Sequence, residues 1–95
     1  MKTRVVNRRK EPFDVYIGRG SRWGNPFSHK GGTWAKEVVA TREEAIRRYR
    51  EWLMTQPDLI RALPTLKGQT LGCWCKPLSC HGDVLAELAE ATDGL

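Results

Sequence analysis

Three cysteines and a histidine lie close together in the chain, at Cys73, Cys75, Cys80 and His81. These side chains can act as nucleophile, as acid or base, or as ligands of a soft metal ion. A disulfide framework is excluded, because cysteines this close cannot staple distant parts of a chain and their number is odd. The thiols are therefore expected to be free or bound to a metal ion, as is usual in a reducing cytoplasm.

Residues 73–83 support three interpretations, and the spacing does not decide among them. In the first, Cys80 is a nucleophile at a helix start, His81 is its acid or base, and Asp83 orients the histidine or caps the helix. In the second, Cys73, Cys75, Cys80 and His81 bind zinc, although a single residue between two cysteine ligands is unusual. In the third, the cysteines are small buried hydrophobic residues.

A second candidate site is the glycine-rich run of residues 18–27. Glycines let backbone N–H groups approach an anion, and two arginines can hold a phosphate. A tryptophan offers a ring for a base to stack on, and an asparagine can read a base edge. The predicted ligand-binding residues are Gly18, Arg19, Gly20, Ser21, Arg22, Trp23 and Asn25. The alternative is a structural turn in which Trp23 and Phe27 fill the core and Pro26 fixes the exit.

The positive charge of the chain is concentrated near its start. The whole chain carries a net charge of +5, and residues 1–30 hold eight basic and two acidic residues, hence +6. A local positive surface attracts nucleic acids and phosphorylated ligands. A nucleotide or nucleic acid is therefore the expected partner.

Both candidate sites must be positioned by a small fold in which strands precede and follow helices. β-Formers predict strands at residues 3–6, 13–17 and 69–75. Helical spacing of apolar residues and capping signals predict helices at residues 41–53, 58–63 and 82–91. Residues 34–39 fit either a helical turn or a short strand. This order predicts an α/β domain whose sheet has three or four strands with helices packed on it.

The helix at residues 41–53 has the clearest signals. Thr41 and Glu44 form the Thr-x-x-Glu pattern of a capping box. Ala45, Tyr49 and Leu53 follow at helical spacing, with Ile46 and Trp52 beside them.

The strand order also predicts where the two candidate sites meet. In open α/β sheets, ligands bind beyond the carboxyl ends of the strands. Residues 18–26 and 76–82 are loops that leave such ends. We therefore expect one pocket that brings Arg19 and Arg22 to the same side of the molecule as His81.

Composition places the chain among soluble globular proteins. Its 95 residues suit one domain, at residues 1–95, and are 40% hydrophobic and 28% charged. Apolar runs are short and the first residues lack a signal segment, which predicts no membrane contact and a cytoplasmic location.

Several motifs together resemble a small family of uncharacterised proteins from bacteriophages and bacteria, whose shared domain has no known function. The resemblance runs from about Val15 to Leu88 and implies a phage accessory protein in the host cytoplasm. More distantly, a strand that ends in cysteine and leads into Cys-His resembles an uncharacterised α/β family with a Cys-His-Arg signature, with Gly82 here in place of the arginine. The motifs are Tyr16-Ile17-Gly18-Arg19, Trp23-Gly24-Asn25-Pro26-Phe27, Arg48-Tyr49-x-x-Trp52-Leu53, Gly72-Cys73-Trp74-Cys75 and Cys80-His81-Gly82-Asp83-Val84-Leu85.

Three functions follow as hypotheses. The first is binding of a nucleotide or nucleic acid through the basic glycine-rich loop beside the Cys/His cluster. The second is a small enzyme that acts on a nucleotide or nucleobase, with Cys80, His81 and Asp83 at its centre. The third is a zinc-stabilised module that binds a host protein. The sequence leaves the ligand and the oligomeric state open.

Overall fold

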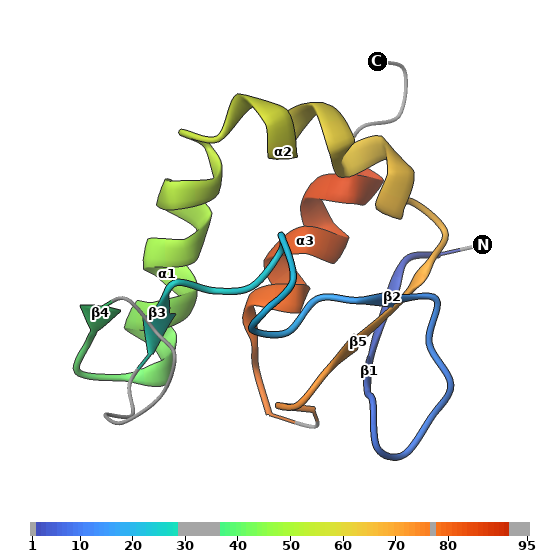
Figure 1. The fold of residues 1–95 in the computed structure, drawn as a ribbon, viewed down its shortest axis with the longest axis horizontal. Helices are drawn as coiled ribbons and strands as arrows, with labels where there is room; N and C mark the ends of the chain where they lie inside the picture. The colour runs from blue at the N-terminus through green and yellow to red at the C-terminus, as the bar shows by residue number, and fades with distance from the viewer. Residues whose placement is uncertain (1, 29–36, 77, 92–95) are drawn as a thin grey trace.

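Three parallel strands form the sheet in this computed structural model, which describes residues 2–28, 37–76 and 78–91. The strands are β1 (Arg4–Asn7), β2 (Val15–Tyr16) and β5 (Thr70–Cys73), and their order is β1-β5-β2. Leu71 of β5 is in register with Val5 on one side and Val15 on the other. The last strand in sequence therefore lies between the first two (Figure 1).

The helices follow the predicted order. They are α1 (Arg42–Leu53), α2 (Pro57–Ala62) and α3 (His81–Glu90), with a 3₁₀ turn, η1 (Leu63–Leu66), after α2. Helix α3 packs against β1 and β5 on one side and against α1 on the other (Figure 1). The expected α/β class, with a three-stranded sheet and helices packed on it, is confirmed.

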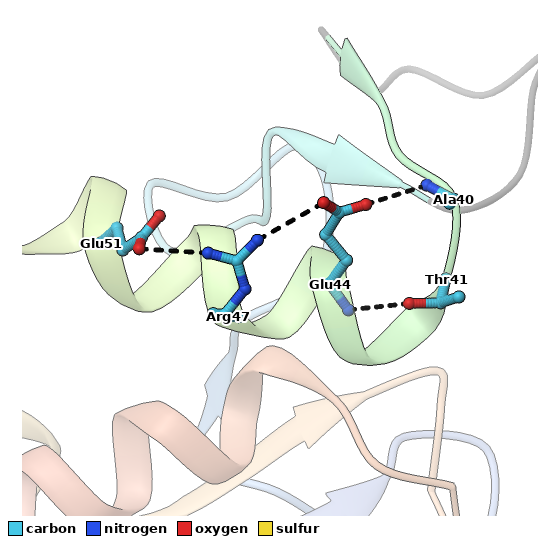
Figure 2. Close-up of polar contacts among 5 residues, drawn as sticks. All are labelled: Ala40, Thr41, Glu44, Arg47 and Glu51. Atoms are coloured by element: carbon cyan, nitrogen blue, oxygen red, sulfur yellow. Dashed lines mark hydrogen bonds and ion pairs between the residues drawn. The ribbon is translucent and has the colours of Figure 1, made fainter.

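Helix α1 begins at a cap that differs in one bond from the predicted capping box. The Thr41 hydroxyl accepts a hydrogen bond from the Glu44 N–H at 3.1 Å, as expected. The Glu44 carboxylate, however, accepts from the N–H of Ala40 rather than from that of Thr41 (Figure 2). Glu44 also pairs with Arg47, which in turn pairs with Glu51. The same two side chains therefore fix the helix start, one residue further back than the standard box.

The strands β3 (Phe27–Ser28) and β4 (Glu37–Val38) form a second, two-stranded parallel sheet. The sequence patterns did not predict this pairing. Residues 34–39 were expected to be a helical turn or a strand. Of these, residues 34–36 lie outside the described part, and Glu37 and Val38 are in β4.

The core lies where α1, α3 and the sheet meet. Helix α1 buries Ala45, Tyr49 and Leu53, the predicted stripe, and α3 buries Val84, Leu85 and Ala89. Burial of such side chains contributes about 1.5–3 kcal/mol for each large aliphatic or aromatic residue. Within residues 2–28, 37–76 and 78–91, no helix is both long and apolar enough to cross a membrane.

Candidate functional site

The two predicted sites share one pocket. Because β1, β5 and β2 are parallel, the loops that follow them all leave the same edge of the sheet. A pocket of about 200 Å³ lies there. Its walls include Gly18, Arg19 and Asn25 from the glycine-rich loop, and four residues from the other stretch, Cys73, Cys75, Cys80 and His81.

Two of the three thiols are buried in mutual contact, and the third faces the pocket. Cys73 ends β5 and Cys80 caps α3, and their Sγ atoms are 3.4 Å apart. Cys73 is 1% exposed and Cys80 is 2% exposed. Cys75 is only partly buried and all three thiols are free. Cys75 is therefore the thiol of the three that a ligand can reach most easily.

The groups around the three thiols lower the pKa of two of them and raise the pKa of the third. Hydrogen bonding by the Cys80 thiol, and then the guanidiniums of Arg42 and Arg19, lower the pKa of Cys75 to about 6. The same hydrogen bond lowers the pKa of Cys73 to about 6, although burial opposes it. The Cys80 thiol is the donor of these hydrogen bonds, and this donation together with burial raises the pKa of Cys80. Cys80 therefore keeps its proton, and a negative charge is favoured on Cys73 or Cys75, of which Cys75 is the less buried.

His81 is a buried, neutral side chain. It is 7% exposed, and its ring meets that of Tyr49 edge-on, with centroids 4.9 Å apart. Its Nε2 lies 2.6 Å from the carbonyl oxygen of Ile17. Because a carbonyl can only accept, Nε2 carries the proton and Nδ1 keeps its lone pair. Burial lowers the pKa of His81 to about 4, so it is uncharged at neutral pH.

Asp83 caps α3, which was one of the two roles expected for it, the other being to orient His81. Its Oδ2 accepts from the N–H of Cys80 at 3.1 Å, and its Oδ1 pairs with Lys76 Nζ at 2.5 Å. The carboxylate thus holds the start of α3 and the loop before it, and its two oxygens serve the backbone and a lysine rather than His81.

The predicted zinc site is not assembled. Among the described residues, no three histidine, cysteine, aspartate or glutamate side chains are arranged to hold a metal ion. In addition, the Nε2 of His81 lies 2.6 Å from the Ile17 carbonyl oxygen, so this atom does not face the three cysteines as a fourth ligand.

The glycine-rich loop is held by its own side chains. Arg19 donates to the carbonyls of Asn25 and Phe27, and Ser21 Oγ donates to the Gly18 carbonyl at 2.6 Å. The Asn25 amide donates to the Ala45 carbonyl and accepts from the Phe27 N–H. Asn25 is therefore engaged with backbone and is not placed to read a base edge.

The two arginines of this loop share one hollow, but only one of them also lines the pocket. Arg19 and Arg22 both line a neighbouring hollow with Gly20 and Ser21, and Arg19 lines the pocket as well. The guanidinium of Arg22 is 5.4 Å from the ring centre of Trp23. Only one of the two arginines expected to share a pocket with His81 does so.

Trp23 is wrong as the stacking residue. It is 4% exposed and belongs to the core, and its carbonyl accepts from the Tyr49 hydroxyl at 2.7 Å. The structural alternative, in which Trp23 and Phe27 fill the core, is what the structure shows, since Phe27 is 7% exposed.

Trp74 is an exposed aromatic side chain at the pocket, and the sequence reasoning missed it. Trp74 is 51% exposed and lines the pocket. The guanidinium of Arg8 is 4.7 Å from its ring centre and 5.0 Å from that of Tyr16. The Trp74 indole N–H donates to the Tyr16 hydroxyl at 3.1 Å. We refer to these side chains as the aromatic–arginine cluster, which comprises Arg8, Arg9, Phe13, Tyr16 and Trp74.

A sequence signal for Trp74 did exist. Cys73 and Cys75 were expected on one face of a strand, and the residue between them must then point to the other face. Arg42 was also missed as a pocket residue. It comes from the first turn of α1 and donates to the Ser79 carbonyl at 3.3 Å, a long-range contact that spacing cannot predict.

Comparisons with known proteins place these features in a family. An uncharacterized 12.4 kDa protein of Enterobacteria phage T4, in the nrdA-td intergenic region, is 39% identical over 87 residues, which span 92% of this chain and 77% of that protein. The uncharacterized protein R718 of Acanthamoeba polyphaga mimivirus is 33% identical over 93 residues, spanning 79% of this chain and 65% of that protein. No solved structure gives a significant match. A family model matches residues 2–91, so the chain belongs to the family described as "Domain of unknown function (DUF4326)".

Proposed function

We propose that this protein binds nucleotides or single-stranded nucleic acid at the carboxyl edge of its sheet. The observation that carries the proposal is Trp74, an indole that is half exposed at the rim of a pocket and has a guanidinium against its ring. An exposed aromatic face among cations is the arrangement on which bases stack while phosphates are held.

The cations around this ring are suited to a phosphate backbone. Arg8, Arg9 and Lys10 follow β1 directly and are exposed. Arg19 and Arg42 line the pocket, and no acidic side chain is among its described wall residues. The aromatic ring and all of these cations except Arg42, which lies in α1, come from loops after β1, β2 and β5, so most of the binding surface depends on the parallel sheet.

The ring and the cations contribute in different ways. Base stacking on an aromatic side chain contributes about 1–3 kcal/mol and tolerates any base. Phosphate contacts add salt dependence, with a slope of about −0.7 per neutralised phosphate for single strands. We therefore expect binding of single-stranded DNA without strong sequence preference and with a steep loss between low and moderate salt.

The test is a titration of a fluorescently labelled oligothymidylate at several salt concentrations. Trp74→Ala should weaken binding by about ten- to a hundredfold, and Trp74→Phe should keep most of the affinity. Arg8→Ala with Arg9→Ala should reduce the salt slope by about 1.4, which is about 0.7 for each lost phosphate contact. Arg61→Ala, an exposed arginine on α2, is the matched control and should change neither. Absence of binding at low salt, or equal affinity of Trp74→Ala and wild type, would falsify the proposal.

A second candidate is a small enzyme that acts on a nucleotide or nucleobase. The observation in its favour is Cys75, a thiol of lowered pKa in the pocket that Trp74 borders. The nucleophile is then Cys75 rather than Cys80, whose buried thiol keeps its proton. Incubation with nucleotides followed by intact-mass measurement tests this, because a covalent adduct that Cys75→Ser lacks would support it. Unchanged mass and unchanged nucleotides would exclude it.

A further inference from the structure

Three thiols gathered at one wall of the pocket form a feature that nucleotide binding does not use. Cys73 and Cys80 have their sulfurs 3.4 Å apart, and a disulfide needs about 2.05 Å, so the pair is in contact but reduced. The Cys80 thiol hydrogen-bonds toward both other cysteines. Cys80 thus lies between a buried partner and the partly exposed Cys75.

We propose that Cys75 and Cys80 form a redox-active dithiol that reduces a hydroperoxide entering the pocket. The proposal is independent of nucleotide binding. It rests on the accessibility of Cys75, on the hydrogen bond between the thiols of Cys80 and Cys75, and on the pocket that both cysteines line with two guanidiniums. Phe27, Ala45 and Ile46 make part of the wall apolar, which suits an organic hydroperoxide.

The chemistry has two balanced steps. In the first, the Cys75 thiolate attacks the terminal peroxide oxygen, the O–O bond breaks, and the alkoxide leaves and takes a proton from water. Cys75 becomes a sulfenic acid. In the second, the Cys80 sulfur attacks the sulfenic sulfur, an S–S bond forms, and hydroxide leaves with the Cys80 proton as water. In sum, two thiols and one hydroperoxide give one disulfide, one alcohol and one water.

The surroundings assign the roles of attacking and resolving thiol. Cys75 is the partly exposed thiol, and the guanidiniums of Arg19 and Arg42 favour its thiolate and the leaving alkoxide alike. Cys80 is 2% exposed, so a hydroperoxide in the pocket meets Cys75 first. Arg42 donates to the Ser79 carbonyl and hydrogen-bonds Cys75, whereas Arg19 donates to two backbone carbonyls. Arg42 is therefore the arginine in direct contact with the attacking thiol.

The experiment treats the reduced full-length chain with tert-butyl hydroperoxide under anaerobic conditions. Free thiols should fall from three to one per chain, and peptide mapping should find the Cys75–Cys80 disulfide. Cys80→Ser should instead stop at a sulfenic acid on Cys75, which dimedone traps. Dimedone labelling of wild type at short times gives the same information should that variant fail to fold.

Matched variants separate this role from a structural one. Arg42→Gln should slow thiol loss by about tenfold. Arg47→Gln, one turn further along α1 and paired with Glu44 and Glu51, should leave the rate unchanged. The proposal is overturned if wild type reacts no faster than free cysteine, if the disulfide joins Cys73 to Cys80 with Cys75 still free, or if the purified chain carries one equivalent of zinc. None of these outcomes bears on oligonucleotide binding, which is measured separately.

Discussion

Cys75 differs from its two neighbours in what it faces. All three line the pocket, but Cys73 and Cys80 are buried against each other, whereas Cys75 is partly exposed beside Arg19 and Arg42. A guanidinium is always charged in proteins and stabilises the thiolate over the thiol. The arginines therefore favour the thiolate form of the most accessible of the three thiols.

The first prediction concerns the pH dependence of this thiol. The Cys80 thiol, Arg42 and Arg19 lower the pKa of Cys75 to about 6, so alkylation by iodoacetamide should reach half its maximal rate near pH 6. An ordinary cysteine reaches it near about pH 8.5. Arg42→Gln removes a positive charge and should move the midpoint to higher pH, and Arg47→Gln should not. A midpoint that Arg42→Gln leaves in place would show that this guanidinium does not act on the thiol.

The second prediction concerns His81 and stability. Burial lowers the pKa of the folded histidine to about 4, from 6.5 in the unfolded chain. Below pH 6.5 the histidine of the unfolded chain binds a proton, whereas the buried histidine stays neutral down to about pH 4. The free energy of unfolding therefore keeps its full His81 contribution above pH 6.5 and decreases as the pH drops toward 4. The full loss is about 3 kcal/mol.

Urea unfolding at several pH values measures this loss. His81→Gln keeps a donor for the Ile17 carbonyl but does not titrate, so its stability should decline less between pH 6.5 and 4. Equal declines in the variant and wild type would mean that other groups account for the acid sensitivity.

At the scale of elements, the close approach of α3 to the sheet brings the pocket walls together. Gly82, in the first turn of α3, is buried against Ile17 and Val5. A methyl group there would lie 2.7 Å from Ile17 Cδ1 and 2.8 Å from Val5 Cγ1. The absence of a side chain at this position therefore lets the helix start, with Cys80 and His81, reach the end of the strands.

The third prediction follows from that contact. Gly82→Ala should destabilise the fold, because overpacking costs about 1–3 kcal/mol and exceeds the gain in helix propensity of about 1 kcal/mol. Val5→Ala removes one of the two clashing atoms, so the double variant should lose less stability than the two single variants together. Strict additivity in chemical denaturation would argue that α3 simply shifts to make room.

The elements of this fold could largely be predicted from the sequence, and the site only in part. Hydrophobic spacing and the Thr41 cap predict α1 well because they are local. The pocket was predicted from the rule that ligands bind at strand ends, and both stretches do line it. The expectation that Trp23 is the stacking residue was wrong, and Trp74 was missed, because burial depends on which loop folds back on the core. Arg42 was missed because its contact with Ser79 spans 37 residues.

At the scale of the whole molecule, basic side chains and thiols lie together at the carboxyl edge of the sheet. The basic residues after β1, the loop after β2 and the thiols after β5 are far apart in sequence but follow adjacent parallel strands. Thr3, just before β1, bonds through its N–H and hydroxyl to Glu90 at the end of α3. The first strand and the last helix are thus tied together at the end of the fold opposite the pocket.

The last prediction follows from this shared edge. Trp74 and Cys75 are adjacent and line the same pocket, so an oligonucleotide stacked on Trp74 should cover the thiol. Its phosphates should also raise the pKa of Cys75 by placing negative charge near a thiolate. Alkylation of Cys75 at pH 7 should therefore slow by about tenfold in saturating oligothymidylate at low salt and recover at high salt. Trp74→Ala should lose the protection while its thiol stays reactive. If wild type binds the oligonucleotide with no change in alkylation, the strand lies elsewhere on the surface, and the basic residues would have to bind it without the pocket.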